Sequence, residues 1–254
     1  MKRFIAFLCL FFALIQPAHA VRVKQYMKTT IGLFDACEQT LTYSFFKDHD
    51  YDVKTTLTTT GTFGALYPFN GMYHAVGTYD KNLFVPQDYF QEAKSRFHHR
   101  TKELIFENGV PKYRVSTKDE KKRRDEVVLN EEYGQSLDFL STLGVILEQI
   151  NRKGNCDFKG YSFSGKHYSL SNVKTAGKEK IKTDYFEGKA LKCKYNLENV
   201  DEDEAGFLLS NGEPVYIWLL KDKKSDAYYV ARIVVESTPF GKLESLTTKI
   251  EVTK

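Results

Sequence analysis

The segment AYYVARIVVESTPFGKLESLTTKIEV, residues 227–252, carries the clearest structural pattern in the chain. Side chains in residues 229–236 and in residues 245–252 alternate between two sets, and a period of two residues is that of a β-strand. In the second run, one set is apolar or β-branched: Leu246, Thr248, Ile250 and Val252. The sequence STPFG at 237–241 joins the runs with a proline and a glycine, which favour a turn. The segment therefore predicts an antiparallel hairpin with one face on a core and the other in water.

Strand-like runs recur at short, regular intervals along the rest of the chain. The segment 39–60 is rich in threonine and aromatic residues, which favour strands. Turn sequences at 107–110, 164–167 and 186–190 separate further runs. These runs are 72–80, 84–93, 98–107, 110–117, 157–164, 167–174, 180–187, 189–198 and 214–221. We therefore predict an all-β fold: a single antiparallel, curved, incompletely closed barrel-like sheet that forms one domain over residues 21–254.

One segment has a helical period instead. In residues 138–151, large apolar side chains recur at three- and four-residue spacing, at Phe139, Leu143, Ile146, Leu147 and Ile150. Ser136 or Asp138 can cap the start, and Gly154 can end the helix. Gly144 lowers the helix propensity by about 1 kcal/mol relative to alanine, so it indicates a close packing contact. We predict an amphipathic helix packed on the open side of the curved sheet. A membrane-surface helix is less favoured, because the polar face is poor in Lys and Arg.

The first twenty residues have the organisation of a secretory signal peptide. Lys2 and Arg3 precede an apolar run over residues 4–15, and residues 18–20 form a small-x-small cleavage site. This apolar run is shorter than the roughly 20 residues that a membrane-spanning helix needs, so an uncleaved anchor is the weaker alternative. We expect cleavage after Ala20, a mature chain without a transmembrane segment, and a location in the bacterial periplasm.

The charge of the mature chain gives no case for a nucleic-acid partner. Loss of Lys2 and Arg3 takes the formal net charge from +4 to +2. The one basic cluster, residues 121–124, is flanked by the carboxylates of residues 119, 120, 125 and 126. Such a compensated run is typical of a solvated loop, and an anion or lipid-headgroup site is the alternative there.

Three cysteines remain after that cleavage: Cys37, Cys156 and Cys193. An oxidising compartment favours one disulfide and one leftover thiol. We favour the pair Cys156–Cys193, which brackets several strand-like runs, and we place Cys37 in an alternating segment where a small, buried and inert residue would fit. Closing the loop between Cys156 and Cys193 would stabilise the fold by roughly 3–4 kcal/mol.

The sequence contains no motif for catalysis or for holding a metal or a cofactor. The zinc-protease, phosphate-loop and nucleophile-elbow patterns are absent. His98 and His99 are adjacent, so on a strand they point to opposite faces and cannot easily share a metal. The acidic run at 199–206 lacks the spacing of an EF-hand loop and is typical of a solvated connection. We therefore predict a non-enzymatic protein with no catalytic residue, no metal ligand and no cofactor.

Several ordered segments resemble the secreted bacterial family called domain of unknown function 3108 (DUF3108). IGLFDACEQTL is similar to its early hairpin, VPQDYF and ELIFENGVPKY to its next strands, and LDFLSTL to its helix start. CDFKGYSFSGKHYSL and ALKCKYNLENVDEDEAGF resemble its two cysteine segments, and VYIWLLKD with the closing hairpin resembles its C-terminal strands. Cys37 stands where the family more often has glycine or alanine, and Ser164 where it usually has Asp. The resemblance implies an incompletely closed antiparallel barrel in the cell envelope and supports the Cys156–Cys193 pair, but it implies no substrate, cofactor or catalytic residue.

A groove between the sheet and the helix is the expected functional feature. A part-barrel that does not close can hold a lipid or another apolar molecule, or an envelope component, between sheet and helix. The candidate lining combines the glycine-rich segment 60–73 with the helix: Phe63, Leu66, Tyr67, Phe69, Phe139 and Leu143. Ordinary core at a sheet edge is the plainer interpretation of 60–73. The alternative function is an envelope protein–protein interaction module that docks a partner through a sheet edge or loops.

Overall fold

The structure is a computed structural model that describes residues 21–46, 49–80, 83–133, 136–200 and 213–253. Its helices are the short α2 (Gly61–Leu66), the 3₁₀ turn η1 (Glu131–Tyr133) and α3 (Phe139–Lys153). The first eight strands are β1 (Val21–Ile31), β2 (Phe34–Phe45), β3 (Asp50–Thr59), β4 (Phe69–Asp80), β5 (Leu83–Ser95), β6 (His99–Glu107), β7 (Val110–Lys118) and β8 (Lys121–Glu126). The others are β9 (Phe158–Phe163), β10 (Tyr168–Lys182), β11 (Glu187–Asn199), β12 (Val215–Lys221), β13 (Tyr228–Val235) and β14 (Leu243–Thr253).

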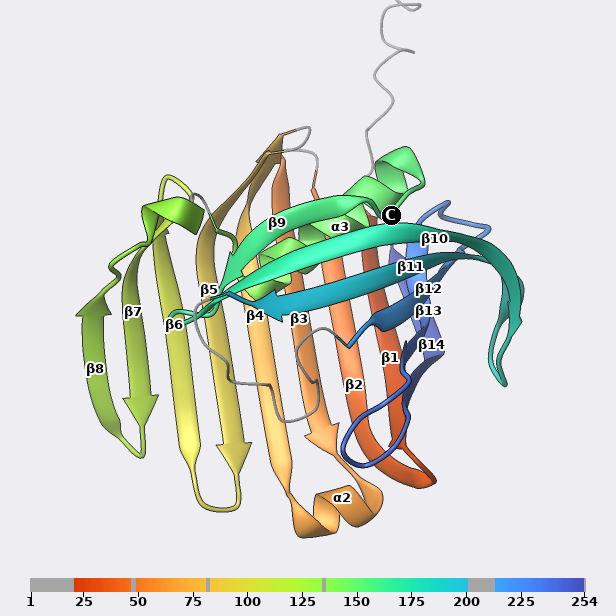
Figure 1. The fold of residues 1–254 in the computed structure, drawn as a ribbon, viewed down its shortest axis with the longest axis horizontal. Coiled ribbons are helices and arrows are strands. Elements are labelled where there is room, and N and C mark those ends of the chain that lie inside the picture. The colour runs from red at the N-terminus through yellow and green to blue at the C-terminus, as the bar shows by residue number, and fades with distance from the viewer. Residues whose placement is uncertain (1–20, 47–48, 81–82, 134–135, 201–212, 254) are drawn as a thin grey trace, which may run out of the picture.

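All fourteen strands belong to one antiparallel sheet with the order β8-β7-β6-β5-β4-β3-β2-β1-β14-β13-β12-β11-β10-β9. Two meanders, one before and one after α3, are joined where β1 pairs with β14. The sheet folds over, so that β9, β10 and β11 cross the face formed by β2–β5 and α3 lies between the two layers (Figure 1). The predicted all-β, barrel-like sheet with one packed helix is confirmed.

The two ends of the sheet approach each other without forming a ladder. The side chain of Lys102 on β6 donates to the Ser164 carbonyl at 2.9 Å, and that of Arg114 on β7 donates to the Gly165 carbonyl at 2.9 Å. Hydrogen bonds from the side chains of Lys102 and Arg114 therefore hold the turn between β9 and β10 against β6 and β7. The barrel remains open, because β8 and β9 are its two edges.

β13 and β14 form a short ladder, which covers only Arg232–Val235 against Leu243–Leu246, and we call this place the corner of the sheet. Beyond this short ladder, the fully buried Gln25 of β1 reaches the backbone of β13. Its Nε2 donates to the Val230 carbonyl at 2.9 Å, and its Oε1 accepts from the Val230 N–H at 3.2 Å. The Gln25 amide thus replaces the neighbouring strand at the corner.

A bulge in β14 corrects the face predicted for the C-terminal hairpin. The register with β1 shifts between Tyr26 and Met27, so Gln25 faces Ile250 whereas Met27 faces Thr247. Ile250 and Val252 therefore pack against the core as predicted. On the N-terminal side of the bulge, the other set of side chains faces the core, so Ser245 and Thr247 are buried in place of Leu246. An extra residue in a ladder reverses every later side chain, which strict alternation cannot anticipate.

The helix α3 lies within two residues of its predicted range. The Asp138 side chain accepts from the Ser141 N–H, which makes Asp138 the N-cap, and Gly154 ends the helix with φ of 70°. Gly144 is the expected close contact, because a Cβ atom there would lie 3.3 Å from Cγ2 of Val53. Eight helix residues are buried, among them Leu140, Leu147 and Ile150.

Three expectations about individual elements were wrong, and one strand was not predicted. Residues 21–31 form that strand, β1, and residues 61–66 of the glycine-rich segment form the helix α2. The basic cluster at 121–124 is part of the exposed edge strand β8 and not a loop. Residues 180–187 do not form a strand of their own: β10 continues to Lys182, and the turn lies at 183–186. There the Thr183 hydroxyl accepts from the N–H groups of Tyr185 and Phe186. These bonds fix the turn at 183–186, a few residues ahead of the predicted turn around Gly188.

The disulfide pairing is as predicted. Cys156 and Cys193 are joined, with 6.0 Å between their Cα atoms and a sequence separation of 37. The bond fastens the segment after α3 to the middle of β11. Cys37 is free and half-buried, and burial raises the pKa of its thiol.

Replacing Gln25 by leucine is expected to destabilise the protein by about 2–3 kcal/mol. The change leaves the Val230 N–H buried without its amide partner, at a cost of about 1–3 kcal/mol, and it leaves the Val230 carbonyl with the hydrogen bond from the Thr247 hydroxyl. Chemical denaturation of Gln25→Leu against the unmodified protein measures the loss.

Gln39→Leu is the matched control for that variant. The Gln39 side chain is only half-buried and donates to the Thr55 hydroxyl at 2.9 Å, which is a side-chain partner that can reorient. We expect a loss of about 1 kcal/mol or less for Gln39→Leu. Equal losses for the two variants would contradict the role given to Gln25.

Candidate functional site

A cavity of about 350 Å³ lies between α3 and the inner face of the folded sheet. One wall is the helix, which contributes Phe139, Leu143 and Ile146 among others. The opposite walls come from both meanders, from β1–β3 on one side and from β10–β14 on the other. We call this space the helix–sheet cavity. Its lining is mostly aliphatic, with Leu, Ile and Val from nearly every contributing element.

The few polar side chains of the helix–sheet cavity are already hydrogen-bonded within the protein. Gln39 donates to Thr55 at 2.9 Å, and Thr142 on α3 donates to the Asp138 carbonyl at 3.0 Å. The Tyr195 hydroxyl lies 3.1 Å from the Ser171 hydroxyl. The lining therefore suits an apolar guest and holds no buried charge that would demand an ionic one.

A buried polar chain fixes the start of the helical wall. The Tyr51 hydroxyl lies 2.6 Å from Oγ of Ser141, and Ser141 in turn donates both its hydroxyl and its N–H to the Asp138 carboxyl group. Because Ser141 donates to Asp138, Tyr51 must donate to Ser141. Asp138 is fully buried, and this burial raises its pKa to about 6 despite the hydrogen bonds from Ser141. The carboxyl group thus anchors α3 to β3 while having a weakened preference for the charged form.

The structure brings together only part of the predicted groove. Phe139 and Leu143 line the helix–sheet cavity, and Phe139 is half exposed at its border. The other four predicted residues do not line it, which corrects the expectation for the segment 60–73. Phe63 and Leu66 belong to α2, Tyr67 follows it, and Phe69 begins β4.

The reason for this correction is the way α2 packs. Gly61 has φ of 57°, and a Cβ atom on Gly64 would lie 2.8 Å from the Thr59 carbonyl. These glycines allow the helix to lie close against the ends of β2 and β3, outside the barrel, and they do not provide an adaptable loop around a guest. The ring of Phe63 instead meets that of Phe240 edge-on at 5.8 Å.

Sequence reasoning missed the lining that the second meander contributes. Tyr195 and Leu197 on β11, Ile217 on β12, and Val230 and Val235 on β13 all face the helix–sheet cavity. Their strands were predicted. The face of each strand that meets the helix is set by the way the whole sheet folds over. No local sequence pattern predicts that folding.

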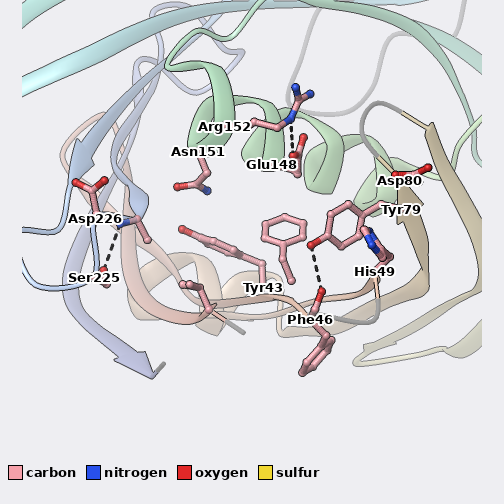
Figure 2. A pocket seen from close by; sticks show the side chains of 13 residues that line it. Tyr43, Phe46, His49, Tyr79, Asp80, Glu148, Asn151, Arg152, Ser225 and Asp226 are labelled. Atoms are coloured by element: carbon pink, nitrogen blue, oxygen red, sulfur yellow. Dashed lines mark hydrogen bonds and ion pairs between the residues drawn. The ribbon is translucent and has the colours of Figure 1, made fainter. Parts of the chain in front are cut away.

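A second, wider cleft of about 660 Å³ lies at the C-terminal end of α3. Figure 2 shows Tyr43 and Tyr79 on its floor and Glu148, Asn151 and Arg152 of α3 above them. Some of its polar groups already have partners within the protein: Arg152 pairs with Glu148 on the same helix at 2.8 Å, and Asn151 accepts from the Tyr228 N–H of β13 at 2.8 Å. We therefore regard the helix–sheet cavity as the better candidate for binding a ligand.

Two further observations concern the described part of the chain. None of its helices is long and apolar enough to cross a membrane. None of its His, Cys, Asp and Glu residues are grouped in threes that could hold a metal ion. The predicted signal peptide at 1–20 and most of the acidic run at 199–206 lie outside the described residues.

The comparisons with known proteins agree with the fold. The model of the family described as "Protein of unknown function (DUF3108)" matches residues 22–248. A solved structure, that of a beta-barrel-like protein of domain of unknown function DUF1849 from Brucella abortus, superposes with a TM-score of 0.56. The two chains share 8% sequence identity over 92% of this chain and 98% of the other, so the similarity concerns the fold alone. No curated protein matches this chain.

The pKa of Asp138 generates a prediction about pH. Its folded-state value of about 6 exceeds the ordinary value of 3.8, so the folded state holds the proton more tightly than the unfolded state. This contribution to stability is fully present below about pH 4 and is lost as the pH rises through about 6. Its size is at most about 3 kcal/mol, at 1.36 kcal/mol per pKa unit.

Asp138→Asn tests this, because the amide keeps an acceptor for the Ser141 N–H but does not titrate. The difference in unfolding free energy between variant and unmodified protein, measured in urea at several pH values, should shift in favour of the variant between pH 4 and 6. A difference that is independent of pH would show that Asp138 does not titrate in this range.

Proposed function

This chain belongs to the DUF3108 family, and we propose that it is a binding protein that holds an apolar molecule, such as an acyl chain, in the helix–sheet cavity. The single observation that carries the proposal is a cavity of about 350 Å³ whose lining is mostly aliphatic. Small-molecule sites in proteins usually measure about 300–1,000 Å³ and are mostly apolar.

The volume itself supports binding. Protein interiors are normally close-packed, so an apolar space of this size leaves its aliphatic lining without packing partners. Burial of about 200 Å² of an apolar guest's surface there contributes about 5 kcal/mol before association costs. This magnitude suits exchangeable carriage.

The alternative, docking of a protein strand at a sheet edge, has less support. The edge strand β8 has the sequence KKRRDE, and its side chains are almost all exposed. Lysine-rich, strongly charged edges are a common device against strand pairing. The other edge, β9, is partly occupied by a parallel bridge between Leu137 and Ser162.

We further propose that the protein works in the periplasm after removal of residues 1–20. The positive start, short apolar run and Ala18-His19-Ala20 site support this proposal. N-terminal sequencing of the protein exported by a bacterial host is expected to begin at Val21. Recovery of a membrane-retained chain that begins at Met1 would contradict it.

The binding proposal is tested with an environment-sensitive fluorescent fatty acid and the delipidated mature protein. Leu143 is half-buried on the helical wall, so Leu143→Trp places a larger ring in the cavity. We expect the unmodified protein to bind the probe and Leu143→Trp to bind it at least about tenfold more weakly, which corresponds to about 1.4 kcal/mol.

Leu66→Trp is the matched control, because it makes the same substitution at an exposed position outside the cavity. It should bind the probe like the unmodified protein, and all three proteins should have similar melting temperatures. If the unmodified protein fails to bind, or if both tryptophan variants bind equally well, the cavity is not a ligand site.

A further inference from the structure

Exposed apolar side chains gather at one end of the barrel. Of the eleven large apolar residues that are exposed in the described chain, six lie on the turns at the α2 end: Leu33, Phe34, Leu66, Tyr67, Phe97 and Phe240. We call these six residues the tip cluster. Leu33 is 98% exposed and Phe97 78% exposed, so neither contributes to the core. A concentration of this kind marks an interaction surface.

Hydrogen bonds and a ring contact join the four segments that carry the tip cluster. Gly32 beside Leu33 donates its N–H to the Lys242 carbonyl at 2.8 Å, which links the β1–β2 and β13–β14 turns. Phe63 of α2 meets Phe240 at 5.8 Å. Arg96 in the β5–β6 turn donates to the Ala65 carbonyl of α2 at 3.2 Å. Figure 1 shows these turns along the lower end of the sheet, beside α2. The side chains therefore belong to one surface.

Basic side chains surround the most exposed aromatic ring of this surface. Lys94, Arg96 and Arg100 lie within three residues of Phe97, all are exposed, and none has an ion pair among the described residues. The carboxylates of Asp119 and Glu92 lie against His98 and His99 and not against these basic side chains. The β5–β6 turn therefore presents an aromatic tip flanked by three cations, an arrangement that complements an anionic surface.

We propose that the tip cluster docks the protein on an anionic phospholipid bilayer. Isolated aromatic and leucine side chains on separate turns, flanked by lysine and arginine, are the pattern of proteins that insert side chains at a membrane interface. A flat protein partner would favour a continuous apolar face, whereas here glycine, proline and polar residues separate the tips.

The position of the cavity supports a lipid surface over a protein one, and this step rests on the proposed function. Val235 and Leu243 line the helix–sheet cavity, and they bracket the turn that carries Phe240. The lower cavity wall is thus continuous with the tip cluster. A bound apolar molecule would leave or enter at the end that contacts the bilayer, where such molecules reside.

Co-sedimentation with sucrose-loaded vesicles tests the proposal on the mature chain. The vesicles contain phosphatidylcholine alone or with about 30% phosphatidylglycerol, at about 0.15 M salt. We expect sedimentation with the anionic vesicles, weaker sedimentation with neutral ones, and a decrease at high salt. Leu33→Ser with Phe97→Ser should weaken binding to the anionic vesicles at least about tenfold, because each lost side chain removes a buried apolar contact. Lys94→Gln with Arg100→Gln should reduce the preference for anionic vesicles.

Val128→Ser is the matched control, because Val128 is 91% exposed but lies outside the tip cluster. It should sediment like the unmodified protein. Absence of vesicle binding, or equal binding by the tip and control variants, would overturn the proposal. So would concentration-dependent self-association in sedimentation velocity that Leu33→Ser with Phe97→Ser abolishes without any vesicle binding, because the cluster would then be a protein interface.

The two proposals fail separately. The tip variant should bind the fluorescent fatty acid in solution with unchanged affinity, and Leu143→Trp should sediment with vesicles like the unmodified protein. If the unmodified protein sediments with anionic vesicles but does not bind the probe, the ligand site alone is rejected. If it binds the probe but does not sediment with anionic vesicles, the docking surface alone is rejected.

Discussion

The folding of the sheet, and with it the rest of the structure, depends on the hydrogen bonds between Gln25 and Val230. A fourteen-stranded antiparallel sheet with a normal twist either closes or folds over. Here it folds where β13 and β14 part after four paired residues, and parting leaves strand backbone groups without a ladder partner. A buried N–H and carbonyl cannot remain unpaired at low cost. The side-chain amide of Gln25 offers one donor and one acceptor at backbone spacing, so the corner can exist inside the core.

The cavity is a consequence of this corner. Once the second meander crosses the first, the two layers must be kept apart by something, and α3 is the only helix of the described chain that lies between them. The helix is fixed at its start by Asp138, Ser141 and Tyr51, and in its middle by the contact of Gly144 with Val53. Both attachments bind it to β3 in the first meander. The space on its other side, toward β11–β13, is therefore not closed by the same contacts, and the helix–sheet cavity lies there.

Local sequence pattern predicted the elements that local forces determine. The helix was found from its period and caps, and most strands from alternation and turns such as Glu107–Val110, where Asn108 and Gly109 adopt positive φ. The faces of β14 were only half correct, because a bulge reverses them in the middle of the strand. Only two of the six predicted lining residues of the site were correct, for a related reason. Phe139 and Leu143 share a helix face with known core residues, whereas the place of Phe63 to Phe69 depends on glycines that pack α2 outside the barrel. Neither the bulge nor that packing leaves a periodic signal.

The actual position of the segment 60–73 also changes the role of its large apolar residues. Large apolar side chains in a glycine-rich stretch were interpreted as a flexible lining, and a lining residue gains its free energy by being buried. Leu66 and Tyr67 are mostly exposed, so they gain little free energy from burial in the folded chain. The four turns that carry the tip cluster are nevertheless held together by backbone and ring contacts, which gives exposed side chains a fixed arrangement without burying them. Because these apolar side chains are held in a fixed arrangement before binding, a later contact loses less conformational entropy. The free energy of burying these side chains is therefore available to a binding partner at this end of the barrel. The lower cavity wall extends toward the same end.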